Sequence, residues 1–357
     1  CDILTRILVI NPGSTSTKIA VYNDGVQEMV ANIEHPAEII SQFPDTISQF
    51  KMREETILQY LADKGYSISD FSAITGRGGM ILPCKAGAYL VNETMVKRLS
   101  ENPITEHASN LGAVLAYELA KTARVDAYIY DSVMVDEFED IARISGMPKI
   151  TRTSASHVLN SRAMAMKVAK KYSKKYEDLN FVVAHLGGGI SLSVHKKGKI
   201  VDIISDDEGP FSPERAGRVP CRSLIDLCFS GEYDKRTVHR MLRGDGGLKA
   251  YLNTTDAREI ESRIANGDKY AKLIYEAMAY QVAKGIGELS TVLEGEVDYI
   301  VITGGIAHSK MFTQWIIKRI KFIAPIEIMA GENEMESLAF GTLRVLRGEE
   351  EAREYIE

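Results

Sequence analysis

Residues 181–204 read FVVAHLGGGISLSVHKKGKIVDII, and this stretch decides the fold because the chain carries a second version of it. Its pattern predicts three strands and two turns, in the order strand 181–184, turn 187–189, strand 190–195, turn 196–198 and strand 199–204. Near the amino end, residues 7–25 read ILVINPGSTSTKIAVYNDG, which repeats the order of apolar strand, polar turn, apolar strand and turn. We interpret this repeat as an internal duplication.

Further strands and helices follow each copy, so both halves combine a β-meander with βα units. We expect strands at 71–75, 126–130, 297–303 and 326–329, and helices at 54–64, 105–124, 156–176, 222–229, 237–243, 256–266, 269–294, 311–320 and from 335. The pattern predicts an α/β fold with two domains and a ligand cleft between them. We expect the N-terminal domain over 1–155, closed by a C-terminal helix at about 340–357, and the C-terminal domain over 156–339.

Composition excludes several classes of protein. The 357 residues carry a formal net charge of −6, whereas a nucleic-acid-binding surface is normally basic. The four cysteines, at positions 1, 84, 221 and 228, are scattered and form no CxxC pair, so neither a disulfide framework nor a zinc site is indicated. The chain has no apolar run of about 18 residues and no signal-peptide core. We therefore expect a cytoplasmic protein that contacts neither membrane nor nucleic acid.

The first turn, Asn11 to Lys18, concentrates hydroxyl groups, an amide and a lysine between two strands. Such a turn offers backbone N–H groups, hydroxyls and a cation to an anion. It is not a P-loop, because the G-x-x-x-x-G-K-[ST] pattern is absent. Taken alone, a Ser/Thr-rich hairpin is more often a simple turn. The second glycine turn at 187–189 favours a pair of phosphate-binding turns, one in each domain.

Four charged or titratable residues are candidates for chemistry. Arg77 follows a strand and stands among glycines, and Arg215 lies in a loop-like segment, although either could be a surface arginine paired with a carboxylate. Asp131 ends a strand and could hold Mg²⁺, or could be a helix N-cap. His157 stands at a helix start, where a structural histidine is the more common case.

Four motifs resemble the acetate and butyrate kinase family, in the family's order and across nearly the whole chain. They are Val9 to Lys18, Ala184 to Gly189, Val301 to Ile306 and Gly331 to Glu334. The compact length and the NPGSTSTK form are most similar to the butyrate kinase branch. The resemblance implies two duplicated actin-like (ribonuclease H-like) α/β domains with mixed sheets that flank a nucleotide cleft, as in sugar kinases, actin and heat-shock chaperone ATPases. It also implies ATP/ADP and Mg²⁺ as cofactors and a homo-oligomer.

The resemblance assigns roles to individual positions. Its catalytic positions fall on Asn11, Arg77, Asp131, His157 and Arg215, its metal positions on Asp131 and Glu334, and its acyl-substrate positions on Arg77, Gly78 and Gly79. Its nucleotide-binding positions fall on Ser14, Ser16, Lys18, His185, Gly187, Gly188, Gly189, Gly304, Gly305, Ile306 and Gly331. Glu336 is close enough to Glu334 to confuse the alignment. By this reading the N-terminal domain binds acyl substrate and phosphate, and the C-terminal domain binds nucleotide.

The chain departs from the acetate kinase pattern in three places, at four positions. Thr153 replaces the first of two histidines four residues apart, so any histidine role in the transition state falls to His157 or is absent. Gly188 replaces an asparagine, so one side-chain donor is lost and backbone N–H groups must supply more of the hydrogen bonds to phosphate. Acetate kinases carry valines after the matching arginine, where they line a small acyl pocket; this chain has Gly78 and Gly79 after Arg77, so those side chains are missing by substitution or by deletion. We expect the missing side chains to leave room for the two extra methylenes of butyrate.

The expected reaction is transfer of the γ-phosphoryl of ATP to the carboxylate of a short-chain acid such as butyrate, reversibly and in line. Acetate kinase or a kinase of branched acids is the nearest alternative. A nucleotide-switched binding module is an alternative from another class, and a sugar kinase would need an aspartate base in place of two arginines.

Overall fold

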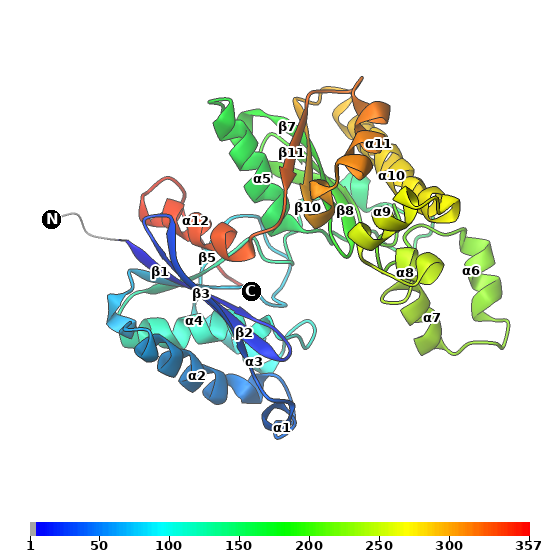
Figure 1. The fold of residues 1–357 in the computed structure, drawn as a ribbon. Coiled ribbons are helices and arrows are strands. Elements are labelled where there is room, and N and C mark those ends of the chain that lie inside the picture. The colour runs from blue at the N-terminus through cyan, green and yellow to red at the C-terminus, as the bar shows by residue number, and fades with distance from the viewer. Residues whose placement is uncertain (1–4) are drawn as a thin grey trace. The chain divides into compact units, whose positions relative to one another are not determined.

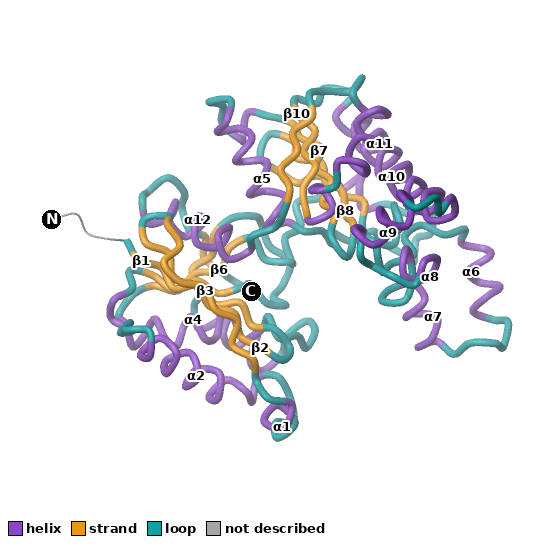
Figure 2. The backbone as a smooth tube through the Cα atoms, viewed as in Figure 1, coloured by secondary structure: helices purple, strands orange, loops and turns teal. Residues whose placement is uncertain are grey.

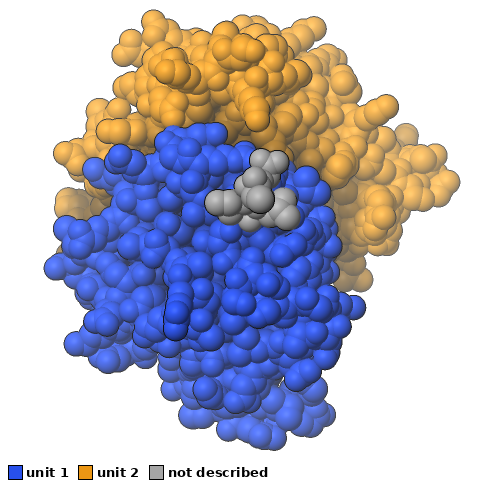
Figure 3. All heavy atoms as spheres, turned by 90° about the vertical axis from the view of Figure 1, so that its left-hand side faces the viewer, with its two compact units in different colours: residues 1–136, 333–357 blue, residues 137–332 orange. Residues whose placement is uncertain are grey.

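The computed structural model describes residues 5–357, which form two compact units (Figure 1). The first unit contains residues 5–136 and 333–357, and the second contains residues 137–332 (Figure 3). Cys1 lies outside the described residues. Each unit is built on one mixed sheet covered by helices (Figure 2).

The sheet of the first unit has seven strands within residues 5–357. Their order across the sheet is β12 (Arg353–Glu354), β5 (Ala88–Leu90), β6 (Asp126–Tyr130), β4 (Ala73–Gly76), β1 (Arg6–Pro12), β2 (Ser16–Asn23) and β3 (Val26–Glu34). Strands β1, β2 and β3 form an antiparallel meander, and β4 and β6 run parallel to β1. The central strands are buried on both faces, which explains the continuous apolar run at Ile7 to Ile10.

The sheet of the second unit has five strands in the described part of the chain. Their order is β11 (Ile326–Ala330), β10 (Tyr299–Gly304), β7 (Asn180–Leu186), β8 (Ile190–Lys196) and β9 (Lys199–Ile204). Strands β7, β8 and β9 form an antiparallel meander, and β10 and β11 extend the sheet in parallel.

The two sheets repeat the same plan, which confirms the predicted duplication. Strands β7, β8, β9, β10 and β11 pair in the order and directions of β1, β2, β3, β4 and β6. The second hairpins agree in detail: Asp24 and Gly25 have φ of 48° and 84°, and Lys197 and Gly198 have φ of 48° and 86°. Two successive positive φ values define a type I′ turn, which matches the twist of the strands it joins. A register shift precedes each turn, at Val21/Tyr22 and at Val194/His195.

Helices cover both faces of the sheet in the first unit. They are α1 (Ala37–Ile40), α2 (Phe50–Asp63), α3 (Glu93–Glu101), α4 (Asn110–Ala123) and α12 (Glu334–Leu346), with short 3-10 turns η1 (Ile47–Gln49) and η2 (Ile68–Asp70). Helix α4 packs very closely on β4, because a Cβ on Gly76 would lie 2.2 Å from the carbonyl oxygen of Gly112. Helix α12 packs on β1, β2, β4, β5 and β6.

The second unit carries a longer series of helices. They are α5 (Val158–Lys171), α6 (Cys221–Cys228), α7 (Lys235–Leu242), α8 (Gly247–Leu252), α9 (Ala257–Ala265), α10 (Lys269–Ser290) and α11 (Lys310–Ile320), with 3-10 turns η3 (Asp140–Arg143), η4 (Tyr176–Asp178), η5 (Thr291–Leu293) and η6 (Gly305–His308). Apolar residues at helical spacing on α10, among them Ile274, Met278, Val282, Ile286 and Leu289, are buried in the core of this unit. Among residues 5–357, none of the helices has the length and apolar character needed to span a membrane.

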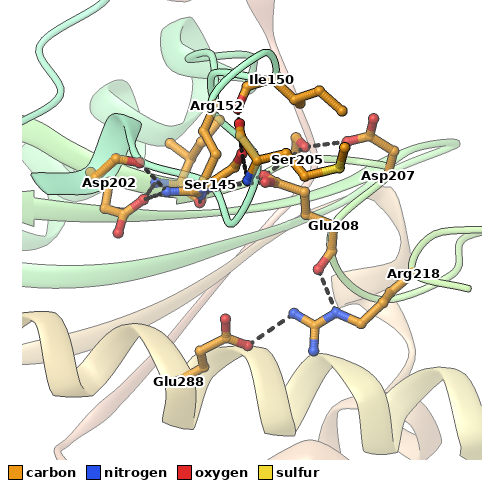
Figure 4. A network of polar contacts seen from close by, with 12 residues as sticks. Ser145, Ile150, Arg152, Asp202, Ser205, Asp207, Glu208, Arg218 and Glu288 are labelled. Carbon is orange, nitrogen blue, oxygen red and sulfur yellow. Dashed lines mark hydrogen bonds and ion pairs between the residues drawn. The ribbon is translucent and has the colours of Figure 1, made fainter. Parts of the chain in front are cut away.

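Residues 137–155 belong with the second unit by their contacts. The Arg152 guanidinium donates to Asp202 on β9 at 3.0 Å and to Glu208 at 2.9 Å, inside a network that also includes Arg218 and Glu288 (Figure 4). The contact division therefore falls at 136/137 and 332/333, whereas the sequence placed the domain boundaries at 155/156 and 339/340. The binding roles assigned to the two domains stay predictions.

Candidate active site

The first turn lies between β1 and β2 and is closed by a hydrogen bond from Gly13 N to Ser16 O at 2.7 Å. Ser14 and Thr15 are exposed at its tip, Ser16 is half-buried, and Lys18 is exposed on β2. Within residues 5–357, no acceptor is found for the backbone N–H of Ser14 or Thr15. The turn therefore presents two N–H groups, hydroxyls and a lysine to solvent, as an anion-binding turn requires.

Two predicted residues of the first unit, Asn11 and Arg77, contact the carboxylate of a third, Glu334. Asn11 Nδ2 donates to Glu334 Oε2 at 2.8 Å, and Arg77 Nη2 lies 3.8 Å from Glu334 Oε1. The backbone N–H of Arg77 donates to Ile10 O at 2.9 Å, because β4 runs parallel to β1 and ends beside it. The buried Nη1 of Arg77 has no acceptor among residues 5–357. Since buried donors are normally paired, this one suits a ligand oxygen.

The two neighbouring glutamates of α12 have different contacts. Glu334 faces Asn11 and Arg77, whereas Glu336 takes part in the helix cap, where its N–H donates to Asn333 Oδ1 at 3.1 Å. Asn333 Nδ2 also donates to the Glu336 carboxylate at 3.1 Å. These contacts favour Glu334 as the site glutamate and give Glu336 a local structural role.

Asp131 follows β6 with a backbone φ of 46°, in the left-handed region that non-glycine residues rarely adopt. It is 2% exposed, and its Oδ1 accepts a hydrogen bond from Gly87 N at 2.7 Å. Its own N–H donates to Gly87 O at 3.1 Å. A strained, buried carboxylate at the end of a parallel strand is a common arrangement at functional sites.

Gly78 and Gly79 do not face open space, so the expected room for longer acids is not created by their missing side chains. A Cβ on Gly79 would lie 2.7 Å from Leu99 Cδ2 and 2.8 Å from Asn110 Oδ1, and one on Gly78 would lie 2.8 Å from Ser132 Cβ. The space that a side chain at either position would need is occupied by neighbouring residues of this chain. The sequence shows that the two side chains are absent, but it does not show that Leu99, Asn110 and Ser132 occupy their place.

The second turn lies between β7 and β8 and is closed by a hydrogen bond from Gly187 N to Gly189 O at 3.1 Å. The Ser212 hydroxyl donates to Gly188 O at 3.0 Å. Arg215 packs directly on the turn, because a Cβ on Gly189 would lie 2.3 Å from Arg215 Nη1. Glycine at this position is therefore required by the arginine, which donates to Asp206 at 3.1 Å. The buried Nε of Arg215 finds no acceptor in the described residues.

Two histidines stack beneath the second turn. The rings of His157 and His185 lie 3.9 Å apart at 14°, and His157 Nδ1 is 2.8 Å from Ser191 Oγ. Asn160 Nδ2 donates to His185 Nδ1 at 2.9 Å, which places any proton of the neutral ring on Nε2, 3.6 Å from Glu332. Burial, and secondarily His157, holds the pKa of His185 well below its usual range. His185 is therefore neutral at pH 7.

A cavity of about 820 Å³ opens in the second unit, and four predicted residues line it: Gly187, Gly188, Gly305 and Ile306. Its other walls include residues that the sequence did not single out, among them Asp256, Arg258, Glu261, His308 and Lys310. Asp256 and Ser309 cap α9 and α11, so two helix amino ends meet this cavity. Helix-start signals at these two positions were the available clue.

Two predicted glycines support the cavity from behind. Gly304 has a φ of 88°, and a Cβ there would lie 2.5 Å from Leu186 O. Gly331 pairs with it through hydrogen bonds of 3.2 Å and 2.8 Å. Both positions require glycine for backbone reasons.

The protein side chains do not form a metal cage: residues 5–357 contain no group of three or more histidine, cysteine, aspartate or glutamate side chains that could hold a metal ion. A single carboxylate such as Glu334 fits the way kinases hold Mg²⁺, which takes most of its ligands from phosphates and water.

Known proteins share both the sequence and the fold. The sequence model of the acetokinase family matches residues 150–341. The chain is 47% identical over 352 residues to butyrate kinase 2 of Clostridium acetobutylicum, an alignment that covers 98% of this chain and 99% of the relative. The crystal structure of Porphyromonas gingivalis acetate kinase matches with a TM-score of 0.78 and 18% identity, over 96% of this chain and 100% of that one. A propionate kinase from Francisella tularensis matches with a TM-score of 0.69 and 18% identity, over 94% and 98%.

The duplicated α/β units share the fold of acetate kinase, and the 47% identity to butyrate kinase 2 shows that the protein is a kinase. The chain belongs to the acetokinase family.

Proposed function

We propose that this enzyme is a butyrate kinase, which transfers the γ-phosphoryl of ATP to butanoate and yields butanoyl phosphate and ADP, reversibly. The observation that carries this proposal is the 47% identity to butyrate kinase 2 over 98% of the chain. The geometry supports it, because each unit holds an anion-type turn with an arginine beside it that has an unused donor.

The acceptor needs no general base in this proposal. A carboxylic acid with a pKa of roughly 4–5 is already ionised at neutral pH. The difficulty is the approach of one anion to another, and Arg77 of the first unit suits the acceptor carboxylate because its buried Nη1 is unsatisfied. Glu334 contacts the Arg77 guanidinium through one carboxylate oxygen and accepts a hydrogen bond from Asn11 on the other, so the two residues fix the position of the guanidinium.

The nucleotide belongs to the second unit in this proposal. The cavity of about 820 Å³ is large enough for a nucleoside and is bordered by the second turn, whose N–H groups suit phosphate oxygens. Arg215 lies directly on that turn and supplies positive charge where the transferred phosphoryl group becomes more negative. Bound Mg²⁺ would neutralise charge on the phosphate oxygens, and Glu334 and Asp131 are the carboxylates proposed to hold it.

The test is an ADP-release assay with acetate, propionate, butyrate, isobutyrate, valerate, glucose and no acceptor. The proposal expects the highest kcat/KM with butyrate and hydroxamate-detectable acyl phosphate as product. A higher kcat/KM for acetate or isobutyrate would make that acid, and not butyrate, the preferred substrate. Activity with glucose alone would contradict carboxylate transfer. ATP binding without turnover of any acceptor would indicate a nucleotide-switched binding module.

A further inference from the structure

Arg53 of helix α2 lies fully buried behind the first turn. Its Nη1 donates to Gly13 O and Ser16 O, both at 2.8 Å, and contacts Thr17 Oγ1 at 3.2 Å. Its Nη2 donates to Ser14 O at 3.2 Å. The guanidinium thus donates hydrogen bonds to three carbonyl oxygens on the inner side of the turn. The N–H groups at the tip of the turn are left to face the solvent.

The remaining donors of Arg53 also form hydrogen bonds to an uncharged group. Nε and Nη2 donate to the Gln49 amide oxygen at 3.1 and 2.8 Å. Among residues 5–357 no carboxylate forms an ion pair with Arg53. All other arginines placed in the site have a carboxylate nearby, Glu334 for Arg77 and Asp206 for Arg215.

A buried charge without a partner is costly for a folded protein. Neutral oxygens satisfy the hydrogen bonds of Arg53 but leave its positive charge uncompensated. The group that would compensate it must carry negative charge and must reach the turn from the solvent side. Phosphate oxygens bound by the exposed N–H groups of Ser14 and Thr15 meet both requirements.

We propose that Arg53 is a positioning residue for phosphate binding, which orders the first turn and strengthens its hold on a polyphosphate through a buried positive charge. This inference rests on the proposed function in that the polyphosphate is the nucleotide or the acyl phosphate formed from it. Arg53 touches neither, because the turn lies between the guanidinium and the solvent.

The titration of neighbouring groups agrees with this role. Burial lowers the pKa of Arg53 to about 10, so the guanidinium remains charged at neutral pH. Burial, and secondarily the Arg53 charge, lowers the pKa of His35, whose Nε2 is 2.7 Å from Thr17 Oγ1. The neighbouring imidazole is therefore neutral, and Arg53 supplies the charge behind the turn.

The experiment compares Arg53→Met, which removes the charge, with Arg53→Lys, which keeps it. Arg6→Met is the matched control, because Arg6 belongs to the same unit but is paired with Glu28. The probe is inorganic tripolyphosphate without added Mg²⁺, with its Kd measured by calorimetry on the full chain. The second readout is KM for ATP against kcat with butyrate.

We expect Arg53→Met to weaken tripolyphosphate binding and raise KM for ATP by about 10- to 100-fold, the size of a unit charge at short range in a partly polar medium. kcat should fall by a smaller factor. Arg53→Lys should bind tripolyphosphate within about 3-fold of the wild type despite a lower Tm, and Arg6→Met should match the wild type.

Wild-type affinity and KM in Arg53→Met would overturn the inference, even if Tm falls, because a purely structural residue gives that result. If Arg53→Met does not fold, Arg53→Lys decides: binding about 10-fold weaker or worse contradicts a role for the charge. A wild-type protein that binds tripolyphosphate but does not phosphorylate butyrate would sink the proposed function and leave this inference standing.

Discussion

The two turns of the duplicated fold share a strand frame but differ in what lies behind them. Behind the first turn, the buried Arg53 guanidinium has no carboxylate partner among residues 5–357. Behind the second turn lie the stacked rings of His157 and His185, of which His185 is neutral, and an arginine whose charge is met by Asp206. The duplication has kept the backbone hydrogen bonds and type I′ hairpins, which depend on few side chains. The side chains have diverged, so the two turns are expected to respond differently to mutation and pH.

The largest effects should come from the two arginines beside the turns. Arg77→Ala and Arg215→Ala should each lower kcat by about 10²- to 10³-fold, since each loses a donor that acts on developing charge. KM for ATP should change less. Steady-state kinetics check this, with Arg98→Ala and Arg218→Ala as controls because both are surface ion pairs. Unchanged turnover in either site variant would remove that arginine from the mechanism.

An intermediate effect should come from the carboxylate beside the first turn. Glu334→Gln should reduce kcat by roughly 10-fold, since it replaces a charged acceptor of Asn11 and Arg77 by an amide. Glu336→Gln is the matched control on the same helix turn. Equal losses in the two variants would mean that the helix end, and not the Glu334 contact, matters.

A smaller effect should come from space at the second turn. A Cβ on Gly188 would meet only Glu214 Oε1, at 3.7 Å, so Gly188→Ala should fold normally but intrude on the cavity. We expect KM for ATP to rise by about 3-fold with unchanged Tm, the modest cost of one methyl group in a binding site. Gly287→Ala on α10 should leave KM unchanged and raise stability by up to about 1 kcal/mol. An unchanged KM in Gly188→Ala would place the nucleotide elsewhere.

The smallest effect concerns pH and separates the turns directly. The pKa of His185 is lowered in the folded protein, so below about pH 6.5 the unfolded chain binds a proton that the folded protein refuses. Its contribution to stability is therefore complete above pH 6.5 and decreases as the pH falls. Urea unfolding from pH 7 to 5 should show a steeper loss for the wild type than for His185→Asn, by up to about 1.4 kcal/mol per pH unit. Parallel curves would contradict a buried neutral His185.

Much of the fold was predictable because its signals are local. The apolar runs of β1, β7 and β10 predicted these strands within a few residues, the helix expected at 269–294 is α10, and the repeated strand–turn order predicted the duplication. Strand β3 was missed because it is largely exposed and lacks an apolar run. Helix α3 was missed because it buries few apolar residues, Met95 and Leu99, and helix α8 was missed because it has only six residues.

The site was predictable only in part, because side-chain contacts come from distant segments. The motifs named Asn11, Arg77 and Glu334, and the structure brings these three together. No pattern in the sequence singled out Arg53, whose role depends on α2 packing under a turn about 40 residues earlier. The space at Gly79 was misjudged for the same reason, since Leu99 and Asn110 fill it.

The return of α12 to the first unit has a consequence for synthesis of the chain. Asn11 and Glu334 are 323 residues apart, and α12 covers strands that are synthesised long before it. A ribosome adds roughly 5–20 residues per second, so those strands wait tens of seconds for their covering helix. The second unit, by contrast, is one continuous segment, residues 137–332. The first unit therefore begins to form before the second unit but is completed after it.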